Sequence, residues 1–289
     1  MDAGTRIETT LAAALDRAAA GAAPPKLVAA VRHAVVPGGA RIRPRLCLAV
    51  AEACGVDDPA AADGVAAAIE LLHCASLVHD DMPCFDDAAM RRGRASVHAA
   101  YGEPVALLAG DALIVMAFET LARGLARAPM RLPALVTTLA RAAGMPFGIA
   151  AGQAWECEPA AVLAEYHRAK TGSLFTAATV GGALAAGVAP EAWQRLGDCL
   201  GEAYQVADDI QDMIADPQQT GKPKGQDALH GRPSAMREMG LDGAAAHLKR
   251  LLAEAIESIP ACPGHVELEA VIRTHAARFV PKALARQAA

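Results

Sequence analysis

The feature that most constrains the fold of this chain is the dominance of alanine and leucine in long periodic segments, which glycine and proline interrupt. Runs of β-branched and aromatic residues, which are typical of strands, are scarce, and only 3% of the residues are aromatic. Breakers such as Gly21–Pro25, Gly102–Pro104 and Pro260–Gly264 leave segments of roughly 10 to 25 residues, which is helix length. The sequence therefore predicts an all-α protein. A helical bundle of this size builds ligand sites in a central cavity between its helices.

Composition limits the number of domains and the classes of binding partner that we expect for this chain. No tract rich in proline, glycine or serine divides the 289 residues, so we expect a single domain over 1–289. The 53% hydrophobic content excludes a disordered chain, and the net charge of −5 with scattered basic residues argues against a nucleic-acid partner. Residues 1–6 lack the features of a secretory signal, which favours a cytoplasmic protein. In the uncharged stretch Thr171–Pro190 we expect a buried helix rather than a membrane span.

A first cluster of aspartates follows a long apolar segment. Asp80 and Asp81 end a helical pattern, Pro83 comes two residues later, and Asp86 follows. Since proline disfavours helical geometry in the residue before it, we expect the chain to turn there and to return Asp86 towards Asp80.

A second cluster lies in an unbroken helical pattern and consists of Asp208, Asp209 and Asp212. Positions 208 and 212 are one helical turn apart and share a face. Buried carboxylates are costly without a cation, and a set of oxygen ligands favours Mg²⁺, with Mn²⁺ as the alternative. Magnesium often bridges carboxylates to substrate phosphates, which also need cationic partners. Such side chains lie near both clusters: Arg91, Arg92, Lys170, Lys222 and Lys224.

The motifs around these clusters resemble those of the trans-polyprenyl diphosphate synthases, and especially the geranylgeranyl diphosphate synthases of bacterial carotenoid-type pathways. They cover most of the chain in the family's order. They are Gly38-Gly39-Ala40-Arg41-Ile42-Arg43-Pro44, His79-Asp80-Asp81-Met82-Pro83, Arg91-Arg92-Gly93, Ala109-Gly110-Asp111, Gly152-Gln153, Lys170-Thr171-Gly172, Tyr204-Gln205-Val206-Ala207-Asp208-Asp209-Ile210-Gln211-Asp212 and Gly221-Lys222.

The resemblance implies a homodimeric transferase with an isoprenoid-synthase-type bundle, in which two aspartate motifs hold Mg²⁺, three ions in all, against an allylic diphosphate. Two ions would be held by Asp80, Asp81 and Asp86, and the third by Asp208, Asp209 and Asp212. The residues that resemble the allylic diphosphate site are Arg91, Lys170, Thr171, Gln205 and Lys222, of which Lys170 and Lys222 also look catalytic. Those that resemble the isopentenyl diphosphate site are Arg43, His73 and Arg92, with Arg41 beside them.

Three positions depart from the family pattern. Ala40 stands where the family usually has a lysine, so one expected contact to isopentenyl diphosphate cannot form. Glu156 stands where an aspartate is more common. The segment after Asp227 lacks the usual lysine, and Arg232 could substitute for it. These departures bear on isopentenyl affinity more than on the reaction itself.

Helix geometry addresses the length of the product. One turn rises 5.4 Å, about one isoprene unit, so Ala75 and Ser76 lie roughly one turn below Asp80. In farnesyl synthases, an aromatic side chain at this level looks like the floor of the product cavity. In this sequence the level has the small residues Ala75 and Ser76, so the cavity is open there. We therefore expect 20 carbons, with the floor formed deeper by Leu72 on the same helix and by Met116 or Phe118 on the helix after Pro104.

Several alternatives stay open at this point. The chain could be a farnesyl diphosphate synthase, or a terpene cyclase, although a cyclase has no use for Arg43, His73 and Arg92 as an isopentenyl diphosphate site. Ala40 and the segment near Arg232 also motivate a regulatory subunit of a heteromeric synthase. Both aspartate clusters argue against that alternative and against a helical bundle without chemistry. The preferred allylic primer, dimethylallyl, geranyl or farnesyl diphosphate, cannot be read from the residues.

Overall fold

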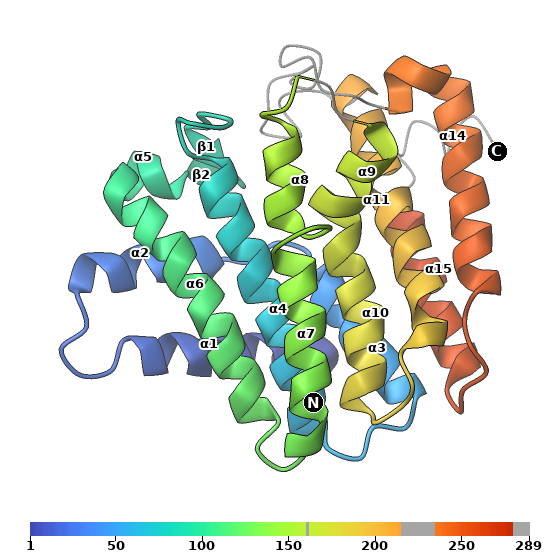
Figure 1. Cartoon of the computed structure of the whole chain (residues 1–289), viewed down its shortest axis with the longest axis horizontal. Coiled ribbons are helices and arrows are strands. Elements are labelled where there is room, and N and C mark those ends of the chain that lie inside the picture. The colour runs from blue at the N-terminus through green and yellow to red at the C-terminus, as the bar shows by residue number, and fades with distance from the viewer. Residues whose placement is uncertain (160–161, 215–234, 280–289) are drawn as a thin grey trace. The chain divides into compact units, whose positions relative to one another are not determined.

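The computed structural model describes residues 1–159, 162–214 and 235–279. Within these ranges the chain is built from helices, and a two-stranded antiparallel hairpin is the one sheet (Figure 1). The all-α prediction is therefore confirmed. The chain forms two compact units: unit 1 contains Met1–Leu139 and Gly181–Val188, and unit 2 contains Ala140–Val180 and Ala189–Ala289. The single domain expected over 1–289 stays a prediction.

Unit 1 holds most of the amino-terminal elements. They are α1 (Ala3–Ala18), α2 (Pro25–Val35), α3 (Ile42–Ala53), α4 (Pro59–Asp80), β1 (Met90–Arg91), β2 (Arg94–Ala95), α5 (Val97–Tyr101), α6 (Glu103–Gly124), a 3₁₀ turn η1 (Pro129–Arg131) and most of α7 (Leu132–Ala143). Capping side chains explain two helix starts, since Asp2 accepts from the amides of Gly4 and Thr5, and Asp58 accepts from the amide of Ala60.

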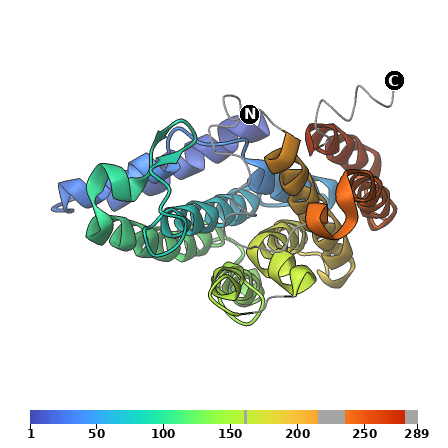
Figure 2. The ribbon, with the colours of Figure 1, turned by 90° about the horizontal axis from the view of Figure 1, so that it is seen from above.

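The core of unit 1 forms around α4, and α6 packs against α4 along its length (Figures 1 and 2). Both helices are long and apolar enough to cross a membrane by length and composition alone. The apolar window of α4 is 78% buried inside the protein and that of α6 is 44% buried. The two helices approach closely at a pair of glycines, since a Cβ on Gly64 would lie 2.8 Å from the Cα of Gly124. The apolar residues of α4 are thus the core of this unit.

Unit 2 holds the other elements. They are α8 (Ile149–Trp155), α9 (Leu163–His167), a π-helical turn η2 (Arg168–Gly172), the first part of α10 (Ser173–Ala185), η3 (Glu191–Trp193), α11 (Gln194–Ile214), α14 (Ala235–Glu257) and α15 (His265–Phe279). The buried helix expected over Thr171–Pro190 is found as α10, which ends at Ala185. Two large buried side chains lie in this part of the unit, Phe175 on α10 itself and Trp193 at the end of η3.

Candidate active site

The first aspartate cluster lies in unit 1, at the carboxyl end of α4. After Pro83 the chain returns, and the backbone amide of Asp86 donates to the carbonyl oxygen of Asp80 at 3.0 Å. A carboxylate oxygen of Asp80 and one of Asp86 lie within 4.8 Å of each other. The loop predicted from Pro83 is therefore confirmed, and it gathers two carboxylates at the end of the helix.

A hairpin brings a cation to this cluster. The Nε atom of Arg91 donates to both carboxylate oxygens of Asp81, at 2.9 and 3.1 Å, and its Nη2 atom donates to Asp80 at 3.4 Å. Arg92 and Gly93 make the turn with φ of 53° and 75°, the two positive values of a tight hairpin turn. Burial raises the pKa of Asp81, and the adjacent guanidinium of Arg91 offsets part of that shift. Arg91 therefore reduces the repulsion among the carboxylates.

The residues that resemble the isopentenyl diphosphate site also lie together in unit 1. The Nη1 atom of Arg43, at the start of α3, lies 3.5 Å from the Nε2 atom of His73 on α4. Desolvation of the ring, together with the positive charges of Arg43 and Arg92, holds the pKa of His73 well below 6.5. Arg92 is exposed and its guanidinium lies against Gly39, where a Cβ would be 2.8 Å from Cζ. A neutral imidazole among arginines is suited to a diphosphate.

Arg41 occupies a different environment from Arg43. Its guanidinium donates to Glu70 at 2.6 Å, to Glu8 at 2.8 Å and to the carbonyl oxygen of Val35 at 2.8 Å. The side chains of Arg41 and Glu70 are 4% and 2% exposed, respectively. Arg41 also has a left-handed backbone, with φ of 51°, directly before α3. We infer that Arg41 joins α1, α2, α3 and α4, which differs from its sequence-based assignment to the substrate.

Lys170 and Thr171 lie in unit 2, in the π-helical turn η2. Lys170–Gly172 do not end a helix, because the chain continues from this turn directly into α10. Two helices approach the turn through glycines. A Cβ on Gly152 of α8 would lie 2.3 Å from the backbone nitrogen of Lys170, and one on Gly201 of α11 would lie 2.6 Å from the Cα of Gly172. These approaches hold the wide turn, a form common at functional sites.

Glu156 binds the Lys170 side chain. Its carboxylate accepts from the ammonium of Lys170, from the hydroxyl of Tyr166 at 2.6 Å and from the amide of Gln153 at 3.1 Å. The side chain of Glu156 is 9% exposed. The sequence singled out this residue only as a departure from aspartate, and the structure shows that it is a largely buried partner of the lysine.

The second aspartate cluster lies in α11, the unbroken helix that the sequence predicted. Asp208 is exposed, whereas Asp209 is 3% exposed. The amide nitrogen of Gln205 donates to Asp209 at 2.9 Å, and the amide oxygen of Gln205 accepts from the hydroxyl of Thr171 at 2.6 Å. The second cluster and the π-helical turn are therefore joined through one glutamine.

Some of the predicted site residues lie outside the part of the chain that the structure describes. Asp212 belongs to the last turn of α11, but its side chain lies outside the described residues, as do Lys222, Lys224 and Arg232. The positions expected to set product length are all described. Leu72, Ala75 and Met116 are buried, and Ser76 and Phe118 are half-buried.

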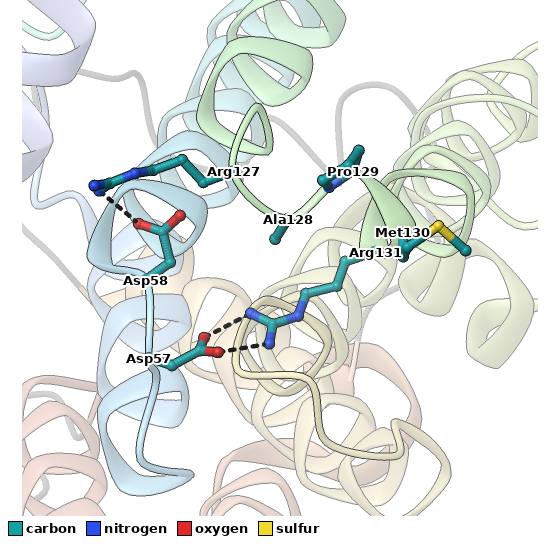
Figure 3. Close-up of a pocket in the computed structure, with 7 residues that line it drawn as sticks. All are labelled: Asp57, Asp58, Arg127, Ala128, Pro129, Met130 and Arg131. Atoms are coloured by element: carbon teal, nitrogen blue, oxygen red, sulfur yellow. Dashed lines mark hydrogen bonds and ion pairs between the residues drawn. The ribbon is translucent and has the colours of Figure 1, made fainter.

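A hollow of about 510 Å³ lies at the other end of α4 and is lined by charged residues (Figure 3). Arg131 reaches both carboxylate oxygens of Asp57, at 2.7 and 3.0 Å, and Arg127 lies 3.9 Å from Asp58. Each carboxylate faces a guanidinium, so the lining is balanced in charge. This hollow is open to solvent and far along α4 from Asp80, and it contains none of the predicted site residues.

The profile of the polyprenyl synthetase family matches residues 24–272. The chain belongs to this family. It is 56% identical to the geranylgeranyl diphosphate synthase of Cereibacter sphaeroides and 50% identical to that of Rhodobacter capsulatus, in both cases over 97% of each chain. Among solved structures it resembles a geranyltransferase from Helicobacter pylori complexed with magnesium and isoprenyl diphosphate, with a TM-score of 0.78 and 28% identity over 95% of this chain and 97% of that one.

As a polyprenyl synthetase, the chain is a transferase with the all-α fold of its structural relatives. The family uses Mg²⁺, and the carboxylate oxygens gathered at Asp80 and Asp86 are the hard donors that this ion prefers. Each unit of this synthetase carries residues that the sequence predicted to bind metal or substrate. Unit 1 carries the first aspartate cluster and the Arg43–His73 pair, and unit 2 carries the π-helical turn and the second cluster.

Sequence reasoning missed several residues around this site. His167 is buried beside the π-helical turn, where Glu156 binds Lys170, and His33 binds Arg94 at 2.8 Å and so anchors the hairpin that carries Arg91. A signal was available for His167, which is a polar residue one turn before Lys170 in the same segment. None was available for His33, because its partner is 61 residues away.

Proposed function

We propose that this polyprenyl synthetase is a geranylgeranyl diphosphate synthase, which joins isopentenyl diphosphate to dimethylallyl, geranyl or farnesyl diphosphate. The observation that carries the proposal is the 56% identity over 97% of the chain to a relative of that name. The gathering of Arg43 and His73 in unit 1 supports a second diphosphate site, which a terpene cyclase would not need.

The reaction begins when the bond between the allylic carbon and the diphosphate oxygen breaks, and the pyrophosphate leaves with both electrons. Bound Mg²⁺ would stabilise the charge that develops on the leaving oxygen. In unit 1 it would be held by Asp80, Asp81 and Asp86, and in unit 2 by Asp208, Asp209 and Asp212. Arg91, Lys170, Thr171, Gln205 and Lys222 would bind the allylic diphosphate and orient it.

The second substrate then captures the allylic cation. Arg43, His73 and Arg92 would hold isopentenyl diphosphate so that its double bond forms the new carbon–carbon bond. A proton is lost from the adjacent carbon, and we assign no side chain to accept it, since the pyrophosphate itself can. The buried apolar residues of α4, Leu72 and Ala75 among them, exclude water that would otherwise trap the cation.

Removal of the metal tests this proposal. With isopentenyl and farnesyl diphosphate as substrates, excess EDTA is expected to lower turnover by at least about 100-fold, since metal stabilisation is worth several kcal/mol. Addition of Mg²⁺ in excess of the chelator restores the rate, whereas Ca²⁺, which is larger, restores less. Turnover that survives EDTA would contradict the metal-dependent mechanism.

A tyrosine below the first aspartate cluster is expected to shorten the product. Ala75 and Ser76 lie four to five residues before Asp80, and an aromatic ring there would fill the space of the fourth isoprene unit. We expect Ala75→Tyr or Ser76→Phe to change the main product from 20 to 15 carbons, measured by chromatography of the dephosphorylated alcohols. Ala122→Tyr, at an exposed position of α6, is the control and leaves the product unchanged. If neither variant shortens the product, the growing chain does not pass Ala75 and Ser76. The proposed placement of the cavity floor at Leu72, Met116 and Phe118 would then be wrong.

We further infer a homodimer, as the resemblance implied, and a location in the cytoplasm, which the sequence favours. Exposed apolar side chains on α6 support an interface between copies, since Leu107, Leu108 and Val115 are 48%, 54% and 68% exposed. The charge balance of the chain supports the absence of a nucleic-acid partner.

A further inference from the structure

His167 has a buried ring nitrogen without a partner. The residue is 6% exposed, and among the described residues its Nε2 atom is one of the few buried polar atoms that make no hydrogen bond. Such atoms are rare in folded proteins, because burial costs them the hydrogen bonds that water would provide. Each one in a native structure therefore calls for an explanation in terms of structure or function.

The unpartnered nitrogen lies beside the second aspartate cluster. Nε2 of His167 is 3.9 Å from the Oδ2 atom of Asp209, while the Oδ1 atom of that carboxylate accepts from Gln205 at 2.9 Å. Asp209 thus has Gln205 on one oxygen and the imidazole near the other. All these residues belong to unit 2, and His167 directly precedes the turn that carries Lys170 and Thr171.

The distance of 3.9 Å between Nε2 of His167 and Oδ2 of Asp209 fits neither a direct hydrogen bond nor a bridging water. It exceeds the 2.7 to 3.2 Å of a hydrogen bond from nitrogen to oxygen. It is also shorter than the roughly 4.6 Å that a bridging water requires with two bonds of ordinary length. A shift of about 1 Å by either side chain would make the direct bond, with Nε2 as the donor.

We propose that His167 is a positioning residue for Asp209, whose Oδ2 atom accepts a hydrogen bond from Nε2 when the site binds magnesium and diphosphate. The proposal rests on the function proposed above. Carboxylates that bind metals are themselves held by hydrogen bonds from outside the coordination sphere, and removal of such a bond typically costs 10- to 100-fold in metal affinity. The imidazole itself is a poor candidate for a ligand, because Mg²⁺ prefers oxygen.

The alternative explanation is that His167 only fills space in the core of unit 2. The two explanations differ in what a phenylalanine at this position does. Phenylalanine keeps the ring and removes the donor, so a space-filling role predicts no effect on magnesium, together with unchanged or higher stability. A positioning role predicts the same unchanged or higher stability, but weaker magnesium binding.

The test compares His167→Phe and His167→Gln with the wild type, and uses His265→Phe, on α15, as the control for the type of substitution. The first readout is the magnesium concentration for half-maximal turnover. The second is the rise in melting temperature on adding MgCl₂ with inorganic pyrophosphate, which does not depend on turnover.

We expect His167→Phe to raise the half-saturating magnesium concentration by about 10-fold or more and to reduce the rise in melting temperature. The melting temperature without metal stays equal to that of the wild type or increases. Glutamine, whose amide nitrogen can replace Nε2, keeps both readouts within about threefold of the wild type, and His265→Phe changes neither.

Unchanged magnesium dependence in both His167 variants would overturn this inference and leave the proposed function intact. A wild-type protein without turnover and without a magnesium response would instead contradict the proposed function. If His167→Phe does not fold, the glutamine variant with His167→Leu decides, since only the positioning role predicts that these two differ in magnesium response.

Discussion

Gly152→Ala is expected to lower kcat/KM for the allylic diphosphate by about 100-fold or more. The added Cβ would lie 2.3 Å from the backbone nitrogen of Lys170 and 2.4 Å from its Cα, and backbone atoms cannot move aside as a flexible side chain can. The π-helical turn must therefore shift by about 1 Å, and a displacement of that size can cost 100-fold in rate. The overpacking itself is expected to cost about 1 to 3 kcal/mol of stability. Steady-state kinetics and urea unfolding measure the two effects.

Gly172→Ala is the matched control for this prediction. It lies in the same turn, but the nearest atom to its added Cβ is 3.7 Å away, which is ordinary contact. Because alanine also favours helical geometry, we expect Gly172→Ala to keep its activity and its stability. Equal effects of the two substitutions would show that the turn is not fixed by α8. Normal activity of Gly152→Ala would contradict the role of this contact in placing Lys170.

Arg41→Leu is expected to lower the free energy of unfolding by about 3 to 5 kcal/mol, because it leaves the buried charge of Glu70 without its partner. The double variant Arg41→Leu/Glu70→Leu is expected to recover most of that loss, since replacing both members of a buried ion pair by apolar residues is often neutral. Chemical denaturation followed by circular dichroism measures all of these values.

The control for Arg41 is Arg32→Leu, which removes an ion pair with Asp16 in which the two side chains are 43% and 71% exposed. Exposed pairs contribute less than about 1 kcal/mol, so this variant is expected to stay close to the wild type. A direct role of Arg41 in binding isopentenyl diphosphate predicts the opposite pattern. Under that assignment, Arg41→Leu would raise KM for isopentenyl diphosphate and leave stability almost unchanged.

Features that depend on local sequence were predictable. The apolar helical pattern that ends at Asp80, with Pro83 after it, predicted both the end of α4 and the return of Asp86. The pattern around Asp208 and Asp209 predicted an unbroken helix, and α11 is one. Proline and helical periodicity act over a few residues, so the sequence alone carries this information.

Features that depend on tertiary contacts were not predictable. The pairing of Arg41 with Glu70 joins residues 29 positions apart, and it is the observation from which we infer a structural role for Arg41. The π-helical turn at Lys170 depends on the approach of Gly152 from α8. No local signal in the sequence distinguishes this turn from an α-helical one. The partner of Lys170 was missed for the same reason, because Glu156 lies 14 residues away across a loop.

The most direct test of the synthase proposal is analysis of the products that the purified protein makes with Mg²⁺. Isopentenyl diphosphate is supplied with dimethylallyl, geranyl or farnesyl diphosphate in separate reactions. The proposal predicts consumption of isopentenyl diphosphate and a linear 20-carbon diphosphate, which would also show that Ala40 is compatible with catalysis. A cyclic hydrocarbon made without consumption of isopentenyl diphosphate would contradict the proposal in favour of a cyclase. The absence of turnover with all three primers would contradict it in favour of a regulatory subunit.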